Sequence, residues 1–265
     1  MVLVGGLFNL KHIKQDKKMS FFSSETIAEG EVVANGGGGG GGGFENLGTE
    51  YDPVALWHFD GDLTDSSGNG YDLSVASGTP SYRTFGIPGT QGLYFDGNLY
   101  LTNAGIPELR ITGDLTIQVL VNLTGGGVRS IVGQGTIGES LETNFLYLMQ
   151  LDATPYLNYV HEYNAGSNAI YLNSSAGAWT REEVSHLMLV RENNVITYYK
   201  NGSLYGSPSG TLTAPAGGTS TITFVGANDG GGNKFEGHMQ SLKIIDRALN
   251  ASERAAEFAK TGYTS

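Results

Sequence analysis

The sequence predicts an all-β protein, a two-sheet antiparallel sandwich with one short C-terminal helix and an extended N-terminal arm. Glycine accounts for 41 of the 265 residues, only 15% of residues are charged, and 39% are hydrophobic. Abundant glycine supplies tight turns with positive φ, and short apolar segments with little charge favour strands. Many such segments, separated by turn residues, indicate a sandwich or a barrel.

The expected strands are runs of β-branched and aromatic residues bounded by turn signals. Residues 115–121 alternate, with Leu, Ile or Val at every second position, so one face is expected to be apolar. Glu192-Asn193-Asn194 and Asn201-Gly202 are typical of hairpin turns. The expected strands are Val54–Phe59, Leu115–Asn122, Val128–Val132, Phe145–Leu151, Tyr156–His161, Ala169–Asn173, His186–Arg191, Val195–Lys200, Thr221–Val225 and Met239–Ile245.

One helix is expected, over Ala251–Lys260. Asn250 supplies the side-chain acceptor of an N-cap, Glu253 stands at the third position of a capping box, and Gly262 can end the helix. Its apolar face is expected to pack on the sandwich through Ala255, Phe258 and Ala259.

The chain divides into an arm over residues 1–50 and a sandwich domain over residues 51–265. Basic residues follow the first apolar stretch instead of preceding it, the reverse of a secretory signal. Eight consecutive glycines, Gly36–Gly43, have the composition of a flexible linker. The alternative hypothesis is an anchoring arm that docks into a larger assembly. Its candidate anchoring residues are Lys11, Lys14, Lys17, Lys18 and the tract from Gly36 to Gly43.

Charge and composition exclude several classes of function. The formal net charge of −11 disfavours binding to a nucleic-acid backbone. No apolar run is long enough to span a membrane. The chain has no Cys, which excludes disulfides and thiolate zinc sites.

A series of motifs points to a family. Trp57-His58-Phe59-Asp60-Gly61 is followed by Asp65–Gly70, Gly92–Gly97, Tyr199–Gly202 and Lys243–Leu249. In this order and spacing, from about residue 54 to residue 260, the chain resembles the laminin-G-like, concanavalin A-like lectin/glucanase jelly-roll family. The resemblance implies two antiparallel sheets packed face to face. It also implies binding to glycans or proteins, often aided by Ca²⁺, in settings such as phage virion proteins and adhesins.

One loop contains candidate metal ligands. Asp60, Asp62, Asp65 and Asn69 could together supply the oxygen ligands that Ca²⁺ prefers. The competing interpretation is that these side chains form turns by bonding to their own backbone.

A second segment contains candidate sugar-binding residues, because sugars are bound by aromatic faces and a few polar groups. The competing interpretation is a solvated strand face in which Tyr is present as a strand former. Trp57 is expected to be a core residue instead. The glycan candidates are Tyr156, Tyr159, His161, Tyr163, Asn164, Asn168 and Tyr171.

No catalytic residues are predicted. Retaining glycosidases need two facing carboxylates, which on a strand requires an alternating pair of acidic residues. Glu139 and Glu142 lie in a glycine-rich loop segment. Glu182 and Glu183 are adjacent, so on a strand they would point to opposite faces.

The predicted function is therefore that of a non-catalytic virion structural protein, a capsid decoration or a tail fibre. The protein would lie at the virion surface, contact other virion proteins through its arm, form homo-oligomers and present its jelly roll to a cell-surface glycan. The alternatives are a cement protein that clamps neighbouring subunits and a bacterial surface adhesin. A glycoside hydrolase is disfavoured because the carboxylate pair is missing.

Overall fold

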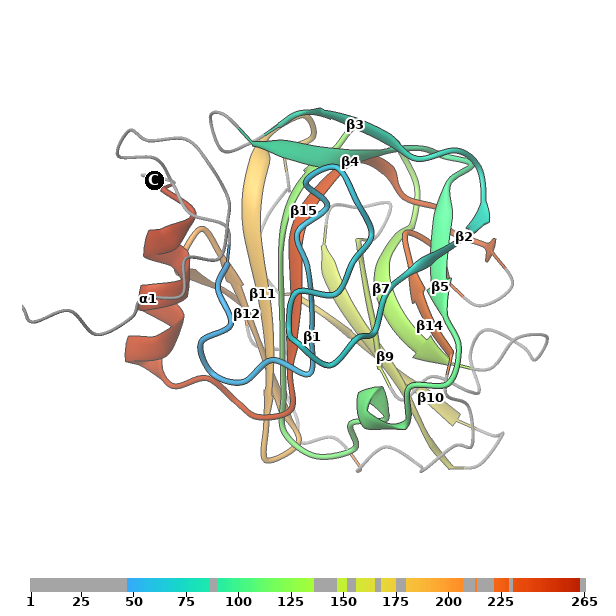
Figure 1. Ribbon diagram of the computed structural model, residues 1–265. Coiled ribbons are helices and arrows are strands. Elements are labelled where there is room, and N and C mark those ends of the chain that lie inside the picture. Colours follow the sequence, from blue (N-terminus) through green and yellow to red (C-terminus); the bar gives the residue numbers. More distant parts are fainter. Residues whose placement is uncertain are drawn as a thin grey trace, which may run out of the picture. The chain divides into compact units, whose positions relative to one another are not determined.

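The structure is a computed structural model. It describes residues 47–85, 90–135, 147–151, 156–164, 168–174, 180–206, 213, 222–228 and 231–262, without the side chains of residues 148 and 161–171. Two antiparallel sheets and one short helix form this part of the chain, which confirms the predicted sandwich (Figure 1). The anchoring residues predicted between Lys11 and Gly43 lie outside the described residues.

The first sheet, sheet A, has the order β13-β12-β11-β6-β15-β4-β3. β15 is its longest strand and is shared: its first half pairs with β4, and its second half pairs with β1. The strands of sheet A are β1 (Ala55–Trp57), β3 (Ser81–Thr84), β4 (Gln91–Asp96), β6 (Leu115–Leu123), β11 (Val184–Glu192), β12 (Val195–Lys200), β13 (Ser203–Gly206) and β15 (Glu236–Ile245).

The second sheet, sheet B, has the order β10-β9-β8-β7-β14-β5-β2. A 3-10 turn, η1 (Pro107–Leu109), follows β5. The strands of sheet B are β2 (Ser74–Ser77), β5 (Tyr100–Asn103), β7 (Arg129–Gly135), β8 (Tyr147–Leu151), β9 (Leu157–Asn164), β10 (Asn168–Asn173) and β14 (Ile222–Val225).

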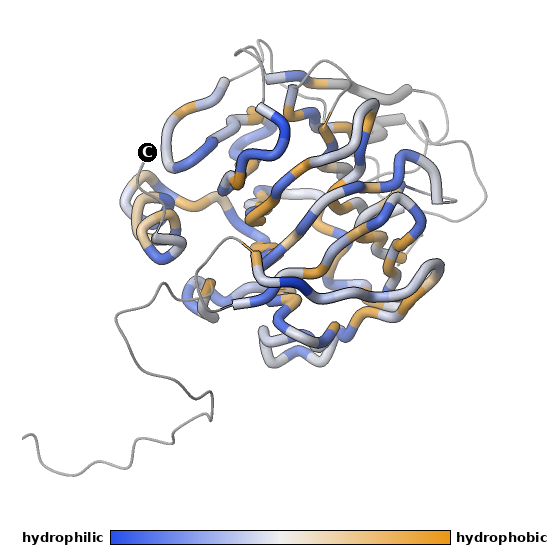
Figure 2. Tube along the Cα trace, turned by 90° about the horizontal axis from the view of Figure 1, so that it is seen from above, coloured by the Kyte–Doolittle hydropathy of each residue, from blue (hydrophilic) through white to orange (hydrophobic). Residues whose placement is uncertain are grey.

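The hydrophobic core lies between the two sheets. The alternating residues of β6 are fully buried there, as the sequence pattern predicts. Trp57 is also fully buried, and its indole N–H donates to the carbonyl of Tyr71 at 2.9 Å, so its only polar atom is satisfied. Along the strands, hydrophobic and hydrophilic residues alternate (Figure 2). Burial of the hydrophobic residues on the inner face of each sheet therefore holds the two sheets together.

Two hairpin turns lie where the sequence predicts them. Asn193 and Asn194 have φ of 49° and 60°, and they join β11 directly to β12. Asn201 and Gly202 have φ of 50° and 74° and join β12 to β13. A turn with positive φ at both central residues matches the twist of the paired strands, and Asn and Gly tolerate this conformation best.

The sequence analysis did not name five strands of the structure: β2, β3, β4, β5 and β13. Each has six residues or fewer, and β2 and β13 expose most of their side chains. β2, β3 and β13 lie at sheet edges, where a strand buries little and its sequence has no clear apolar period, whereas β4 and β5 are interior strands too short to show one.

The helix α1 (Ala251–Lys260) begins with the predicted capping box. The Asn250 side chain accepts from the backbone of Glu253, whose own side chain accepts from the Asn250 backbone. The predicted packing face is correct for Phe258, whose ring lies 5.9 Å from that of His186 on sheet A, but Ala255 and Ala259 are exposed, while the charged Glu257 is fully buried. α1 lies on the outer side of sheet A (Figure 1), where polar side chains of the sheet bind Glu257.

The first described residues belong to the sandwich domain. Leu47 is buried, and the Glu50 carboxylate lies 2.6 Å from the ammonium of Lys260 at the end of α1. No helix in the described ranges is both long enough and apolar enough to cross a bilayer.

Candidate functional site

The loop with the predicted metal ligands is organised around Asp65. Its Oδ1 accepts from the backbone N–H groups of Leu56 and Ser67, at 3.0 and 2.9 Å. Its Oδ2 accepts from the Ser67 hydroxyl at 2.7 Å and from the Tyr71 N–H at 3.0 Å. Oδ1 thus ties the loop to strand β1, and Oδ2 holds the loop together.

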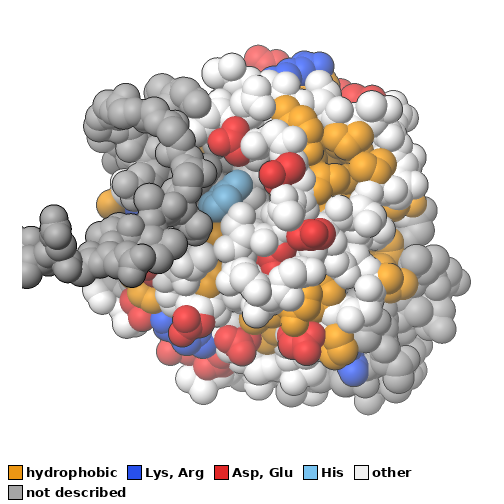
Figure 3. Space-filling view, viewed as in Figure 1, with side chains coloured by type: hydrophobic (Ala, Val, Ile, Leu, Met, Phe, Trp, Pro, Cys, Tyr) orange, Lys and Arg blue, Asp and Glu red, His pale blue; other side chains and the backbone are white. Residues whose placement is uncertain are grey.

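The other three candidate ligands bind elsewhere. Asp60 accepts from the backbone of Gln91, Asp62 accepts from the backbone of Thr64, and the Asn69 amide donates to the carbonyl of Val54 at 2.9 Å. Within the described residues, no group of three or more acidic or His side chains could hold a metal ion. Acidic side chains are spread over the face of the molecule seen in Figure 3. The predicted Ca²⁺ ligands are therefore not gathered into a site, because each carboxylate serves a turn or a strand connection.

Asp65→Asn is expected to lower the free energy of unfolding by about 1–3 kcal/mol, because the amide nitrogen cannot accept the bonds that Oδ2 now accepts. Urea denaturation measures this loss. Asp62→Asn is the matched control: its carboxylate accepts one exposed backbone bond, so the change should stay within about 0.5 kcal/mol. Equal stabilities of the two variants would contradict the central role of Asp65.

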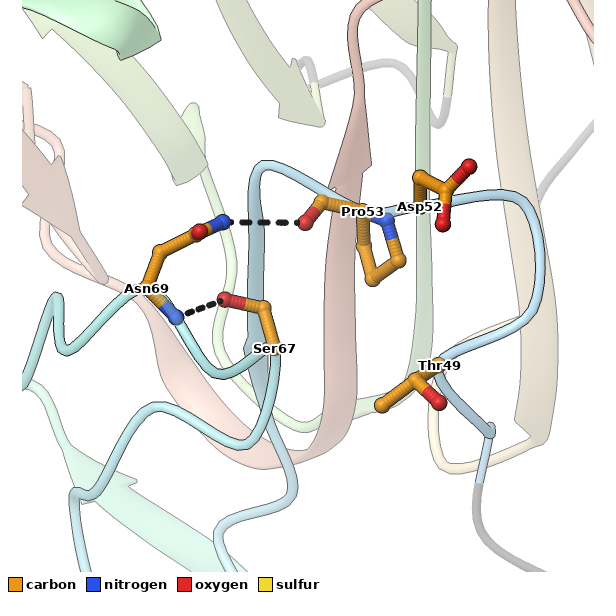
Figure 4. Close-up of a pocket in the computed structure, with 5 residues that line it drawn as sticks. All are labelled: Thr49, Asp52, Pro53, Ser67 and Asn69. Atoms are coloured by element: carbon orange, nitrogen blue, oxygen red, sulfur yellow. Dashed lines mark hydrogen bonds between the residues drawn. The ribbon is translucent and has the colours of Figure 1, made fainter.

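A polar pocket of about 490 Å³ opens beside this loop. Figure 4 shows Ser67 and Asn69 on one side of it, Thr49 and Asp52 on the other, and Pro53 between them. Asp52 adopts a positive φ of 49°, a conformation that costs a non-glycine residue free energy. Asn69 thus lines a pocket, and none of the five residues that line it is aromatic.

The structure contradicts one glycan-binding candidate. Tyr159 is fully buried in the core, and its hydroxyl accepts from the guanidinium of Arg191 at 2.5 Å. Arg191 is also fully buried and donates to the carbonyls of Ile111 and Gly113, at 2.7 and 2.6 Å. Burial raises the pKa of Tyr159 to about 12. This ring closes one end of the core and presents no face to a sugar.

The remaining candidates lie around β9 and β10, at one edge of sheet B. Tyr156 directly precedes β9 and is half-buried. Residues 161–164 end β9, and β10 begins at Asn168, with Tyr171 paired to Val160. Apart from Tyr156, the side chains of the remaining candidates lie outside the described set: His161, Tyr163, Asn164, Asn168 and Tyr171.

The strand register reveals a polar row that the sequence analysis did not identify. Ser130 of β7 pairs with Gln150 of β8, Gln150 pairs with Asn158 of β9, and Asn158 pairs with Asn173 of β10. Paired residues of antiparallel strands project to the same side of a sheet. The neighbours of Gln150 along β8, Met149 and Leu151, belong to the core, so the row projects from the outer face of sheet B.

Three side chains of this row are buried, each with an oxygen atom that lacks a hydrogen-bond partner in the described part of the chain. Ser130, Gln150 and Asn158 are 0%, 6% and 4% exposed, and the oxygen atom of each side chain has no partner within the described structure. A buried polar atom without a partner costs about 1–3 kcal/mol, so each of the three oxygens would be stabilised by a hydrogen-bond donor.

An apolar row lies beside the polar one. Phe224 pairs with Gly133 on β7, and Val160 lies two residues beyond Asn158 on the same face of β9. Phe224 and Val160 are both almost fully buried, yet neither belongs to the core between the sheets. Amide and hydroxyl oxygens next to an aromatic and an aliphatic side chain are the groups with which proteins bind sugars.

The family model for the concanavalin A-like lectin/glucanases superfamily matches residues 95–253, more than half of the chain. This chain belongs to that superfamily. The predicted family resemblance is therefore confirmed. A search of the curated proteins finds none that matches this chain.

Solved structures share the fold at low sequence identity. Domain 4 of AbnA, a GH43 extracellular arabinanase from Geobacillus stearothermophilus solved in complex with arabinotriose, is 17% identical with a TM-score of 0.59; the match covers 80% of this chain and 99% of that one. The binding domain of Paraclostridial Mosquitocidal Protein 1 is 16% identical with a TM-score of 0.62, at 79% and 52% coverage. The binding domain of botulinum neurotoxin serotype G is 14% identical with a TM-score of 0.58, at 78% and 50% coverage. This chain spans about half the length of the two toxin binding domains.

Proposed function

We propose that this chain is a non-catalytic attachment protein that binds carbohydrate at the outer face of sheet B. The observation that carries the proposal is the row of Ser130, Gln150 and Asn158, whose three buried oxygens lack partners. Sugar hydroxyls are donors of the kind that these oxygens need. The adjacent Phe224 and Val160 provide the apolar contact that sugar rings make. Because the three side chains are at most 6% exposed, a ligand reaches them only after the protein rearranges, which lowers the apparent affinity.

Two comparisons favour this function over catalysis. The arabinanase domain was solved with arabinotriose, and this chain matches nearly its whole length. The toxin domains are described as binding domains. On the sequence side, no alternating carboxylate pair occurs within an expected strand.

The test is a glycan array with the full-length protein, followed by calorimetry on the best ligand. Gln150→Ala is expected to weaken binding about tenfold, the loss of roughly one hydrogen bond to a sugar. Gln91→Ala is the matched control, because it removes an exposed amide from sheet A and should leave the affinity unchanged. Thermal melts check that both variants fold. Failure of the full-length protein to bind any glycan, or equal affinities of the two variants, would overturn the proposal.

We further propose that the protein acts at a virion surface, as a capsid decoration or tail fibre, with residues 1–46 docking onto other virion proteins. The lysines between residues 11 and 18 and the glycine octet support a docking role. Several copies on one particle would bind glycans together, and such avidity can exceed single-site affinity by about 10²–10⁴-fold. Deleting residues 1–46 should abolish incorporation into particles while glycan binding by the remaining domain persists. Normal incorporation of the truncated chain would refute the docking role.

A further inference from the structure

A group of reactive side chains lies between sheet A and α1, outside the proposed glycan site. Lys243 of β15 pairs directly with Gln118 of β6, and both side chains are fully buried on the outer face of sheet A. Glu257 of α1, also fully buried, lies over them. An amine, a carboxamide and a carboxylate thus share a site closed to water.

The hydrogen bonds orient these groups for a reaction with one another. Glu257 Oε2 accepts from Lys243 Nζ at 3.0 Å, and the same oxygen accepts from Gln118 Nε2 in a short bond. The amine and the amide therefore flank a single carboxylate oxygen. Since a carboxylate only accepts, this contact fixes which end of the Gln118 amide is nitrogen.

His186 of β11 completes the arrangement. Its Nε2 lies 3.0 Å from Gln118 Oε1, and because that oxygen only accepts, His186 is the donor. A donor at this oxygen stabilises the negative charge that develops there when a nucleophile attacks the amide carbon. The His186 ring packs at 5.9 Å against the ring of Phe258, which belongs to α1.

We propose that Lys243 and Gln118 become joined by an intramolecular isopeptide bond after folding, with Glu257 as the proton carrier. The bond that forms links Lys243 Nζ to Gln118 Cδ, and the bond that breaks links Gln118 Cδ to Nε2. Both protons that Nζ loses pass through the Glu257 carboxylate to the departing nitrogen, which leaves as ammonium. The reaction needs no oxidant and no other reactant.

The surroundings favour the nucleophilic form of the amine. Burial lowers the pKa of Lys243 from its ordinary value, although Glu257 opposes this shift. Lys260 donates to the other oxygen of Glu257 at 2.9 Å and also lies 2.6 Å from the Glu50 carboxylate. Glu257 therefore still has a cation beside it after Lys243 has reacted. A desolvated lysine beside a general base is the usual form of an activated amine.

The consequence is a covalent link between the two central strands of sheet A. Strands β6 and β15 are far apart in the sequence, so the bond would close a long loop of chain and restrict the unfolded state, as a disulfide does. A protein that holds a particle to a surface under load would gain resistance to unfolding from such a link.

The test is mass spectrometry of the purified full-length protein. Its intact mass is expected to be lower than the sequence mass by one ammonia per chain. A tryptic digest should show the Gln118 and Lys243 peptides as one branched species, uncut after Lys243. Glu257→Gln and Lys243→Met should each restore the full mass, whereas Lys200→Gln, which breaks an ion pair with Glu183 outside this group, should leave the link in place.

Two results would overturn the proposal. One is an unlinked pair of peptides in the folded wild-type protein. The other is an ammonia loss that maps to one of the three Asn-Gly steps, Asn35-Gly36, Asn69-Gly70 or Asn201-Gly202, where cyclisation of the Asn side chain would cause it. The wild-type measurement decides the matter even where a variant fails to fold.

Discussion

Gly237→Ala is expected to lower the free energy of unfolding by about 3–5 kcal/mol. Gly237 lies in β15 with φ of 142°, a conformation that L residues rarely adopt. A Cβ at this position would lie 2.0 Å from the backbone oxygen of Asn122 on β6. Because that oxygen belongs to the backbone of a central strand, it cannot move aside without disturbing the pairing of β6 and β15.

Urea denaturation monitored by circular dichroism measures this loss. Gly113→Ala is the matched control, because no atom lies within 4 Å of a Cβ built there and its φ is not positive. It should leave stability unchanged or raise it by up to about 1 kcal/mol, since alanine restricts the unfolded chain. A loss below about 1 kcal/mol for Gly237→Ala would mean that β15 can shift along β6, contrary to the close approach in the structure.

Local patterns predicted the features of this fold that depend on neighbouring residues. The alternation in β6 identified one face of the core, and the Asn-rich and Asn-Gly turns fixed two hairpins. The capping box located the start of α1. Each of these features is stabilised by residues within a few positions of one another, so the sequence alone contains the whole interaction.

Features formed by distant residues could not be predicted in this way. Ser130, Gln150 and Asn158 become a row only through the register of three strands. Nothing in the helix sequence indicates that Glu257 is buried, because charged residues are rarely buried without a partner. Its partners, Lys243 and Gln118, come from strands far away in the sequence. Tyr159 is a sugar-binding candidate in the sequence because its segment is rich in aromatic and polar residues, and its burial depends on Arg191, which lies on the other sheet.

Stability is expected to fall as the pH is lowered from about 6.5 to about 4, in part because of His186. Its imidazole is 1% exposed, and burial lowers its pKa from 6.5 to about 4. In this pH range the unfolded chain binds a proton at His186 and the folded chain does not, so stability rises with pH and is lost on acidification. The full shift corresponds to roughly 3 kcal/mol.

The groups around His186 explain why the folded protein disfavours the charged imidazole. Its Nε2 already donates to Gln118, and the Phe258 ring lies beside it, so a proton on Nδ1 would add a buried charge with no carboxylate in contact. His186→Gln removes the titrating group and keeps a donor. Urea denaturation at several pH values should show a wild-type loss between pH 6.5 and 4 that is smaller in the variant by roughly 3 kcal/mol. If both proteins lose the same free energy of unfolding between pH 6.5 and 4, the imidazole is protonated in the folded protein. Water would then have to reach the space between α1 and sheet A.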